Sequence, residues 1–86
     1  MNAVSQIDWY ERRHELEEGQ VFQSCYGLVK LDHRKPGDGT QWVVATWNPG
    51  YPPGETYPGA APYWCYDESA IEPGDLEGEP LPDPKP

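Results

Sequence analysis

The stretch TQWVVATW, residues 40–47, is the strongest strand signal in the chain. Six of its eight residues are β-branched or tryptophan, and such side chains favour the pleated surface of a sheet. Side chains alternate between the two faces of a strand, so Trp42, Val44 and Thr46 lie on one face and Val43, Ala45 and Trp47 on the other. Both faces carry large apolar side chains, so one of them must belong to a hydrophobic core.

A second apolar stretch, QVFQSCYGLVKL, precedes this strand at residues 20–31. Both of its alternating sets contain apolar members, which predicts a strand that is covered on both faces or that curls around a small barrel. Gly27 lies in its middle, where a bulge or a tight bend is the usual reason for a glycine. The intervening DHRKPGDGT, residues 32–40, holds Pro-Gly and Asp-Gly pairs, so we expect the two strands to form a hairpin.

Two more elements follow further along the chain. YWCYDES, residues 63–69, predicts a third strand. SAIEPGDL, residues 69–76, places one apolar residue before a Pro-Gly pair and another after it. This pattern indicates a single turn that Ile71 and Leu76 pin against the core.

The segment NPGYPPGETYPGAAP, residues 48–62, contains five prolines and three glycines. The chain after Pro62 is too short to fold alone, so both ends of this segment should be anchored in one sheet. Prolines lower the entropy lost on ordering, and Tyr51 and Tyr57 supply side chains that can pack. We therefore expect a semi-rigid loop over the sheet, comparable to an Ω-loop, and regard it as the leading candidate for a functional surface.

At the N-terminal end, SQIDWYERRHELEEG predicts a short helix at about residues 5–18. Ser5 and Asp8 have the spacing of a capping box, with aspartate in place of the usual glutamate. Ile7, Tyr10 and His14 would then share one helix face. The acidic outer face is open to two interpretations, a solvated surface or a partner site.

At the C-terminal end, prolines occupy every second position from 80 to 86. Such a segment can form neither a hydrogen-bonded helix nor a central strand, so we expect an extended, exposed and loosely held tail. The sequence therefore divides into a single small β domain over residues 1–76 and an acidic proline-rich tail over residues 77–86.

These elements predict a mainly β fold, a small curled antiparallel sheet. The order of strand, hairpin, strand, long loop, strand and one-turn element over residues 20–76 is similar to that of SH3-like barrels. The chain lacks the acidic-aromatic ligand-groove motif of true SH3 domains, so the resemblance implies an architecture and no family. The alternative is an α+β sheet with the N-terminal helix packed across it.

The charge of the chain excludes several classes of partner. Its 86 residues carry a net charge of −9, which argues against direct binding to nucleic acid or to an anionic membrane. The apolar runs are too short for a transmembrane helix, and the N-terminus does not resemble a signal peptide. We therefore expect a cytoplasmic protein with Cys25 and Cys65 as reduced thiols.

No residue pattern in the chain indicates catalysis. Four residues could bind zinc, namely Cys25, Cys65, His14 and His33. They lack the close pairwise spacing that structural zinc sites usually show. A Cys–His nucleophile needs an electropositive setting, which neither cysteine has in the sequence. We expect a non-enzymatic protein with no catalytic residue, no metal and no cofactor.

The function that the sequence favours is binding to a protein partner, and the acidic charge favours a basic one. Exposed aromatic residues beside prolines resemble binding hot spots, although Tyr51 and Tyr57 could instead fold back to cover the sheet. The candidate partner-binding residues are Trp47, Tyr51, Tyr57, Tyr63 and Trp64. The alternative is an acidic DNA mimic or inhibitor, of the type that phages and mobile elements encode, acting on a nucleic-acid-binding enzyme.

Overall fold

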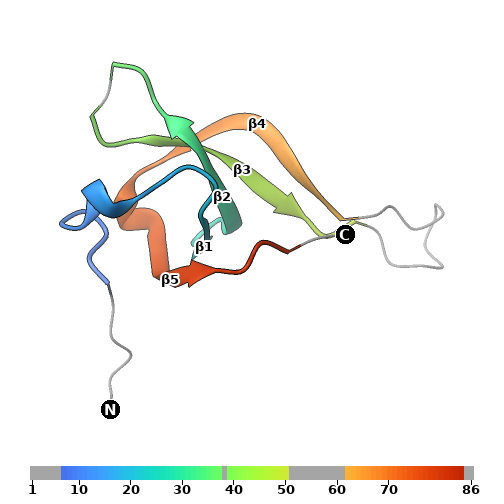
Figure 1. The fold of residues 1–86 in the computed structure, drawn as a ribbon. Helices are drawn as coiled ribbons and strands as arrows, with labels where there is room; N and C mark the ends of the chain where they lie inside the picture. The colour runs from blue at the N-terminus through green and yellow to red at the C-terminus, as the bar shows by residue number, and fades with distance from the viewer. Residues whose placement is uncertain (1–6, 38, 51–61, 85–86) are drawn as a thin grey trace, which may run out of the picture.

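The computed structural model describes residues 7–37, 39–50 and 62–84. They form a five-stranded antiparallel sheet with the strand order β4-β3-β2-β1-β5 (Figure 1). The strands are β1 (Val21–Ser24), β2 (Gly27–Arg34), β3 (Trp42–Asn48), β4 (Tyr63–Ile71) and β5 (Leu76–Leu81), and two 3₁₀ turns are η1 (Arg13–Glu15) and η2 (Pro73–Asp75). The mainly β fold class is confirmed, as are the hairpin between β2 and β3 and the strand over residues 63–69.

The predicted single strand over residues 20–31 is wrong, because the chain reverses in its middle. β1 and β2 form a tight antiparallel hairpin in which Ser24 pairs with Gly27, so Cys25 and Tyr26 make the turn. Gly27 has a φ of 96°, a left-handed conformation that glycine adopts without strain. The Ser24 hydroxyl accepts a hydrogen bond from the Tyr26 N–H at 3.0 Å and donates one to the Gly27 carbonyl at 2.8 Å. Of the two explanations for Gly27, a bulge or a tight bend, the structure shows the bend, and it is sharp enough to reverse the chain.

A bulge does occur in β4. Between the Thr46–Cys65 pair and the Val44–Ser69 pair, β3 advances by two residues and β4 by four. Glu68 supports this irregularity with a positive φ of 61°. The extra residues bend β4 at the outer edge of the sheet.

The hydrophobic core lies mainly on one side of the sheet and is completed by the N-terminal segment. Its buried members are Trp9, Leu16, Phe22, Val29, Leu31, Trp42, Val44, Ile71 and Leu76. Trp9 packs edge-to-face on Phe22, with the ring centroids 5.2 Å apart, and its indole N–H donates to the Gly78 carbonyl at 2.9 Å. The neighbouring residues Val21 and Phe22 are both buried, so the start of β1 is covered on both faces, whereas Gln23 is exposed.

The predicted N-terminal helix is not present in its described part, residues 7–18, which forms turns and the short η1. The Asp8 carboxylate accepts hydrogen bonds from the backbone N–H groups of Tyr10 and Glu11, but Leu16 is already extended. Arg13 donates to the Tyr10 carbonyl at 2.6 Å, an acceptor that a continuing helix would use. Short helices are marginal in water, so burial of Trp9 and Leu16 decides the local path of the chain.

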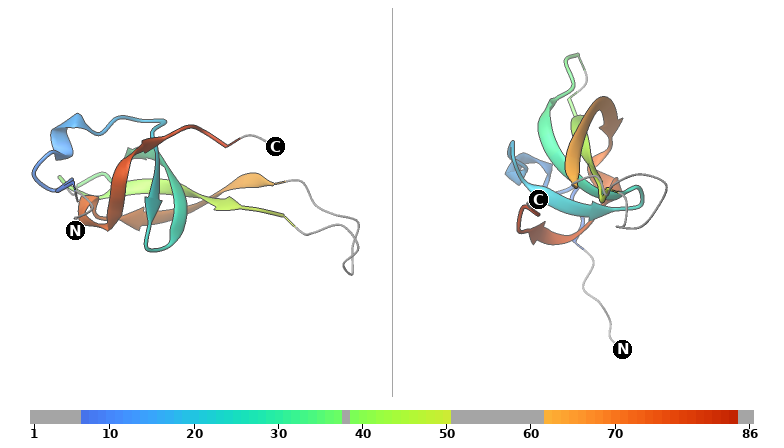
Figure 2. Two further views of the ribbon diagram at one scale, coloured as in Figure 1. Left: turned by 90° about the horizontal axis from the view of Figure 1, so that it is seen from below. Right: turned by 90° about the vertical axis from the view of Figure 1, so that its right-hand side faces the viewer.

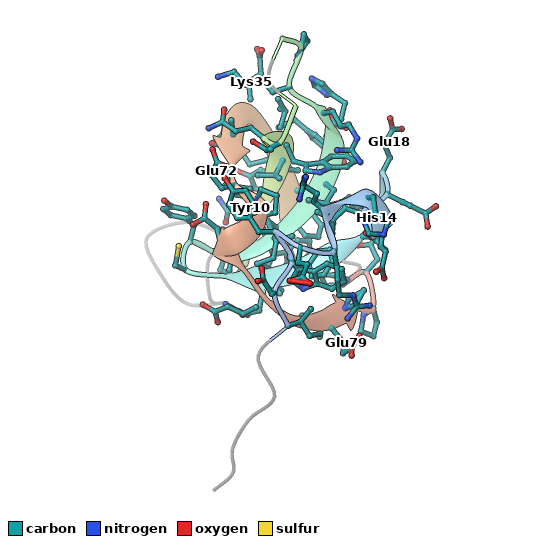
Figure 3. The ribbon with its side chains drawn as sticks, turned by 90° about the vertical axis from the view of Figure 1, so that its left-hand side faces the viewer. Tyr10, His14, Glu18, Lys35, Glu72 and Glu79 are labelled. Atoms are coloured by element: carbon teal, nitrogen blue, oxygen red, sulfur yellow. The ribbon has the colours of Figure 1, made fainter. Side chains whose placement is uncertain are left out.

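The predicted turn near residues 69–76 is confirmed. Ile71 and Leu76 are each 5% exposed, and η2 lies between them. Glu72 joins this corner to two distant segments, since its carboxylate accepts hydrogen bonds from Tyr10 at 2.7 Å and Gln41 at 2.7 Å. Figure 3 shows Tyr10 and Glu72 side by side.

The described part of the C-terminal tail, residues 77–84, is extended and mostly exposed, as predicted, but it is not loose. β5 is exposed from residue 77 to 81 and pairs with β1, where Val21 lies opposite Leu81. Beyond β5 the chain runs beside β3 and β4 towards the end of their hairpin (Figures 1 and 2). Pro80 is compatible with this strand because β5 is an edge strand, which can leave N–H positions unpaired.

Within the described residues the sheet is open, with β4 and β5 as its edges. The barrel closure that the SH3-like order implied is therefore not confirmed. None of the helical turns in this part of the chain has the length and apolar character that a membrane crossing requires.

Candidate functional site

Three of the predicted partner-binding residues come together where β3 ends and β4 begins. Trp47 lies opposite Trp64 in the sheet, and Asn48 lies opposite Tyr63. The two indole rings pack edge-to-face with their centroids 5.1 Å apart. We call Trp47 and Trp64 the aromatic face. Tyr63 precedes Trp64 in β4, so its side chain lies on the opposite side of the sheet, beside Asn48. Two further candidates, residues 51 and 57, lie outside the described residues.

The aromatic face and Tyr63 are partly exposed and held in place. Tyr63 is 49% exposed, and its hydroxyl accepts a hydrogen bond from the Asn48 amide at 3.1 Å. Trp47 and Trp64 are half-buried. The cross-strand pairing and the ring contact fix these side chains, so they would lose little conformational entropy on binding.

Lys30 lies beneath the aromatic face, in the middle of the sheet. It pairs with Val21 on β1 and with Ala45 on β3, both of which are buried. Its ammonium lies 5.0 Å from the centroid of the Trp64 ring, and only 20% of its side chain is exposed. A cation at this position over an indole is electrostatically favourable.

Asp83 completes the cluster from the C-terminal tail. Its Oδ2 lies 2.8 Å from the Lys30 ammonium, and its Oδ1 accepts a hydrogen bond from the Trp64 indole N–H at 3.0 Å. We call Lys30, Trp64 and Asp83 the clasp. It ties the tail to the start of β4, which is the opposite edge strand of the sheet.

Sequence reasoning missed both Lys30 and Asp83. The sequence places Lys30 next to the basic residues of the β2–β3 loop, and Asp83 within an acidic tail. One signal was available, because Lys30 lies between Val29 and Leu31 in an apolar strand, where an isolated charge needs a partner. Nothing local in the sequence identifies Asp83 as that partner.

The residues considered for zinc and for catalysis are dispersed. Cys25 is exposed in the β1–β2 turn, and Cys65 is half-buried in β4. His33 is exposed and contacts Asp32 at 2.8 Å. Among the described residues, no three of the His, Cys, Asp and Glu side chains are grouped so that they could hold a metal ion.

The exposed Tyr26 has a perturbed environment. Its pKa is raised, first by the neighbouring Cys25 and then by the negative charge of Asp75. Both groups disfavour the phenolate, so Tyr26 is not activated as a base or a nucleophile.

A shallow pocket of about 370 Å³ opens beside Tyr26. Its lining consists of Tyr26, Val29, Val44, Thr46, Ser69, Ala70 and Ile71. The three large aliphatic members are at most 5% exposed, so they present little surface to a ligand. The pocket offers less accessible apolar area than a small-molecule site normally needs.

Comparisons with protein-family models, with curated proteins and with solved structures give no match for this chain.

Proposed function

We propose that this protein is a non-enzymatic interaction module that binds a protein partner through the aromatic face, Tyr63 and the adjoining proline-rich loop. The observation that supports the proposal is the convergence of Trp47, Tyr63 and Trp64 at one end of the β3–β4 hairpin, with Tyr63 49% exposed. Tryptophan and tyrosine are the residues most enriched in binding hot spots. The contribution of Tyr51 and Tyr57 stays a prediction.

A basic partner fits the charge of the chain. Six basic residues stand against fifteen acidic ones, and Lys30 is already paired with Asp83. Complementary charge speeds encounter and disfavours acidic competitors. We expect association with the partner to slow as salt is added, because exposed charges are then screened.

We further propose that the sheet is an SH3-like barrel left open between β4 and β5. The Trp64–Asp83 hydrogen bond supports this proposal, since it joins the first part of β4 to the chain just beyond β5. A side-chain contact thus stands where backbone pairing would close a complete barrel.

The proposal can be tested by quantitative affinity capture from the source cell with three versions of the full chain. Wild type and Tyr26→Ala should retain the same saturable partner, and Trp47→Ala should lose it by about 10-fold or more, as expected for a hot-spot residue. Tyr26 is a suitable control because it is 67% exposed and lies in the β1–β2 turn, away from the aromatic face.

Two results would contradict the proposal. One is equal capture by Trp47→Ala and wild type when both have the same far-UV circular dichroism. The other is loss of the captured partner on addition of duplex DNA, with a steep salt dependence, which would favour the acidic DNA-mimic alternative.

A further inference from the structure

The clasp brings two donors of different kinds to one carboxylate. The Lys30 ammonium lies 2.8 Å from one oxygen of Asp83, and the Trp64 indole N–H donates to the other at 3.0 Å. Charge-assisted hydrogen bonds of this length are stronger than neutral ones. Each oxygen has its own donor, so the arrangement selects a carboxylate over a neutral amide, whose NH₂ group would have to face one of the two donors.

The two donors belong to the sheet, whereas the acceptor belongs to the tail. Lys30 is fixed at its backbone by pairing with both β1 and β3, and its side chain is 80% covered. Trp64 is held by its ring contact with Trp47. The donor pair would therefore keep its geometry if the tail moved away, which is the property of a preorganised binding site.

The residues on either side of Asp83 explain how the tail reaches the donors. Pro82 and Pro84 have no backbone N–H, and their rings hold φ near −65°. A residue before proline is also restricted to extended conformations. The segment thus presents the carboxylate from a stiff, extended backbone, and it loses little entropy when it docks.

We propose that Lys30 and Trp64 form a recognition site for the aspartate of an extended Pro-Asp-Pro segment, and that the chain's own Asp83 is its resident ligand. The tail then covers one edge of Trp64. A partner that docks on the aromatic face must displace the tail or accommodate it, and this consequence alone rests on the proposed function. The site itself can be tested without any partner.

The first test follows the Trp64 indole N–H by NMR in the full-length protein. Asp83→Ala should shift this resonance and speed its exchange with water by about 10-fold or more, because it removes the acceptor of the indole hydrogen bond. Glu77→Ala is the matched control, since it removes another carboxylate from the same exposed tail. An indole resonance that is the same in Asp83→Ala and wild type would overturn the proposal.

The second test supplies the ligand in trans as the peptide acetyl-Leu-Pro-Asp-Pro-amide. It should bind Asp83→Ala and return the Trp64 indole resonance towards its wild-type position. Wild type should need at least about 10-fold more peptide, because its own tail is present at an effective concentration near the millimolar range. The analogue with asparagine in place of aspartate should bind at least about 10-fold more weakly.

A double variant, Asp83→Ala with Lys30→Met, tests whether the Lys30 ammonium recognises the aspartate carboxylate of the peptide. Methionine keeps much of the buried stem but removes the ammonium, so the aspartate peptide should lose its advantage over the asparagine peptide. Equal binding of the two peptides to Asp83→Ala, or no shift of the Trp64 indole at about 10 mM peptide, would overturn the proposal. Either failure would leave the partner-capture result for Trp47→Ala unaffected, so the two proposals can fail separately.

Discussion

At the scale of single residues, Asp67 shows how one carboxylate supports the irregular part of β4. Its Oδ1 accepts hydrogen bonds from the Ser69 hydroxyl at 2.7 Å and the Ser69 N–H at 3.3 Å. These two hydrogen bonds hold the pKa of Asp67 below its ordinary value of about 3.9, and the one from the hydroxyl has the larger effect. The carboxylate thus fixes the backbone beside Glu68, the residue with positive φ.

The lowered pKa predicts the sign of a pH effect. A carboxyl whose pKa is lower in the folded state contributes stability that is complete above its unfolded value, and this stability is lost as the pH falls through the folded value. We expect Ser69→Ala to raise the pKa of Asp67 towards about 3.9, because the larger of the two interactions disappears. An NMR titration of the side-chain carboxyl carbon measures this pKa directly. An unchanged pKa in Ser69→Ala would show that the hydroxyl does not stabilise the carboxylate.

At the scale of elements, the β1–β2 hairpin depends on the conformation of Gly27. A Cβ added there would meet no atom within 4 Å, so the cost of a side chain comes from the φ of 96° alone. We expect Gly27→Ala to lower the free energy of unfolding by about 1–2 kcal/mol, as for other L-residues in left-handed backbone conformations. Urea denaturation followed by tryptophan fluorescence measures the change.

Gly39→Ala is the matched control for this prediction. Gly39 also has open space around its Cα, but it does not have a left-handed φ. Alanine should therefore be neutral there, or stabilising by up to about 1 kcal/mol through the unfolded state. Equal destabilisation by the two substitutions would show that the φ of Gly27 is not the cause.

At the scale of the whole molecule, Trp9 connects the first described segment of the chain to the last strand. It is 3% exposed, packs on Phe22 and donates its indole N–H to the Gly78 carbonyl in β5. The N-terminal segment is thereby joined both to the core and to the last strand. A chain of 86 residues has a small core, so the loss of one large contact should affect its entire stability.

We expect Trp9→Ala to lower the free energy of unfolding by about 3–5 kcal/mol, the usual range for removing a buried tryptophan. Tyr10→Phe, in the adjacent position, should cost only about 1 kcal/mol, because it removes the hydroxyl that binds Glu72 from a side chain that is 44% exposed. Thermal unfolding followed by circular dichroism compares the two. A similar effect of both substitutions would mean that Trp9 is not a central core residue.

The local features of the fold could be predicted from the sequence. The strand at residues 40–47, its hairpin with the preceding strand and the turn between Ile71 and Leu76 follow from β-branched side chains, alternation and Pro-Gly pairs. Trp47, Tyr63 and Trp64 were identified as candidates because they flank one loop in the sequence. All of these signals act over a few neighbouring residues.

Propensity, alternation and charge belong to single residues and their neighbours, so the sequence alone predicts which segments are extended, where most turns fall and that the chain is acidic. Contacts between distant parts of the chain set three further features: the reversal at Gly27, the burial of Trp9 and Leu16 without a helix, and the pairing of the tail with β1. The clasp also depends on contacts between distant parts of the chain. Lys30 and Asp83 form an ion pair because the order of the strands brings the C-terminal tail over β2. No local sequence pattern encodes that order.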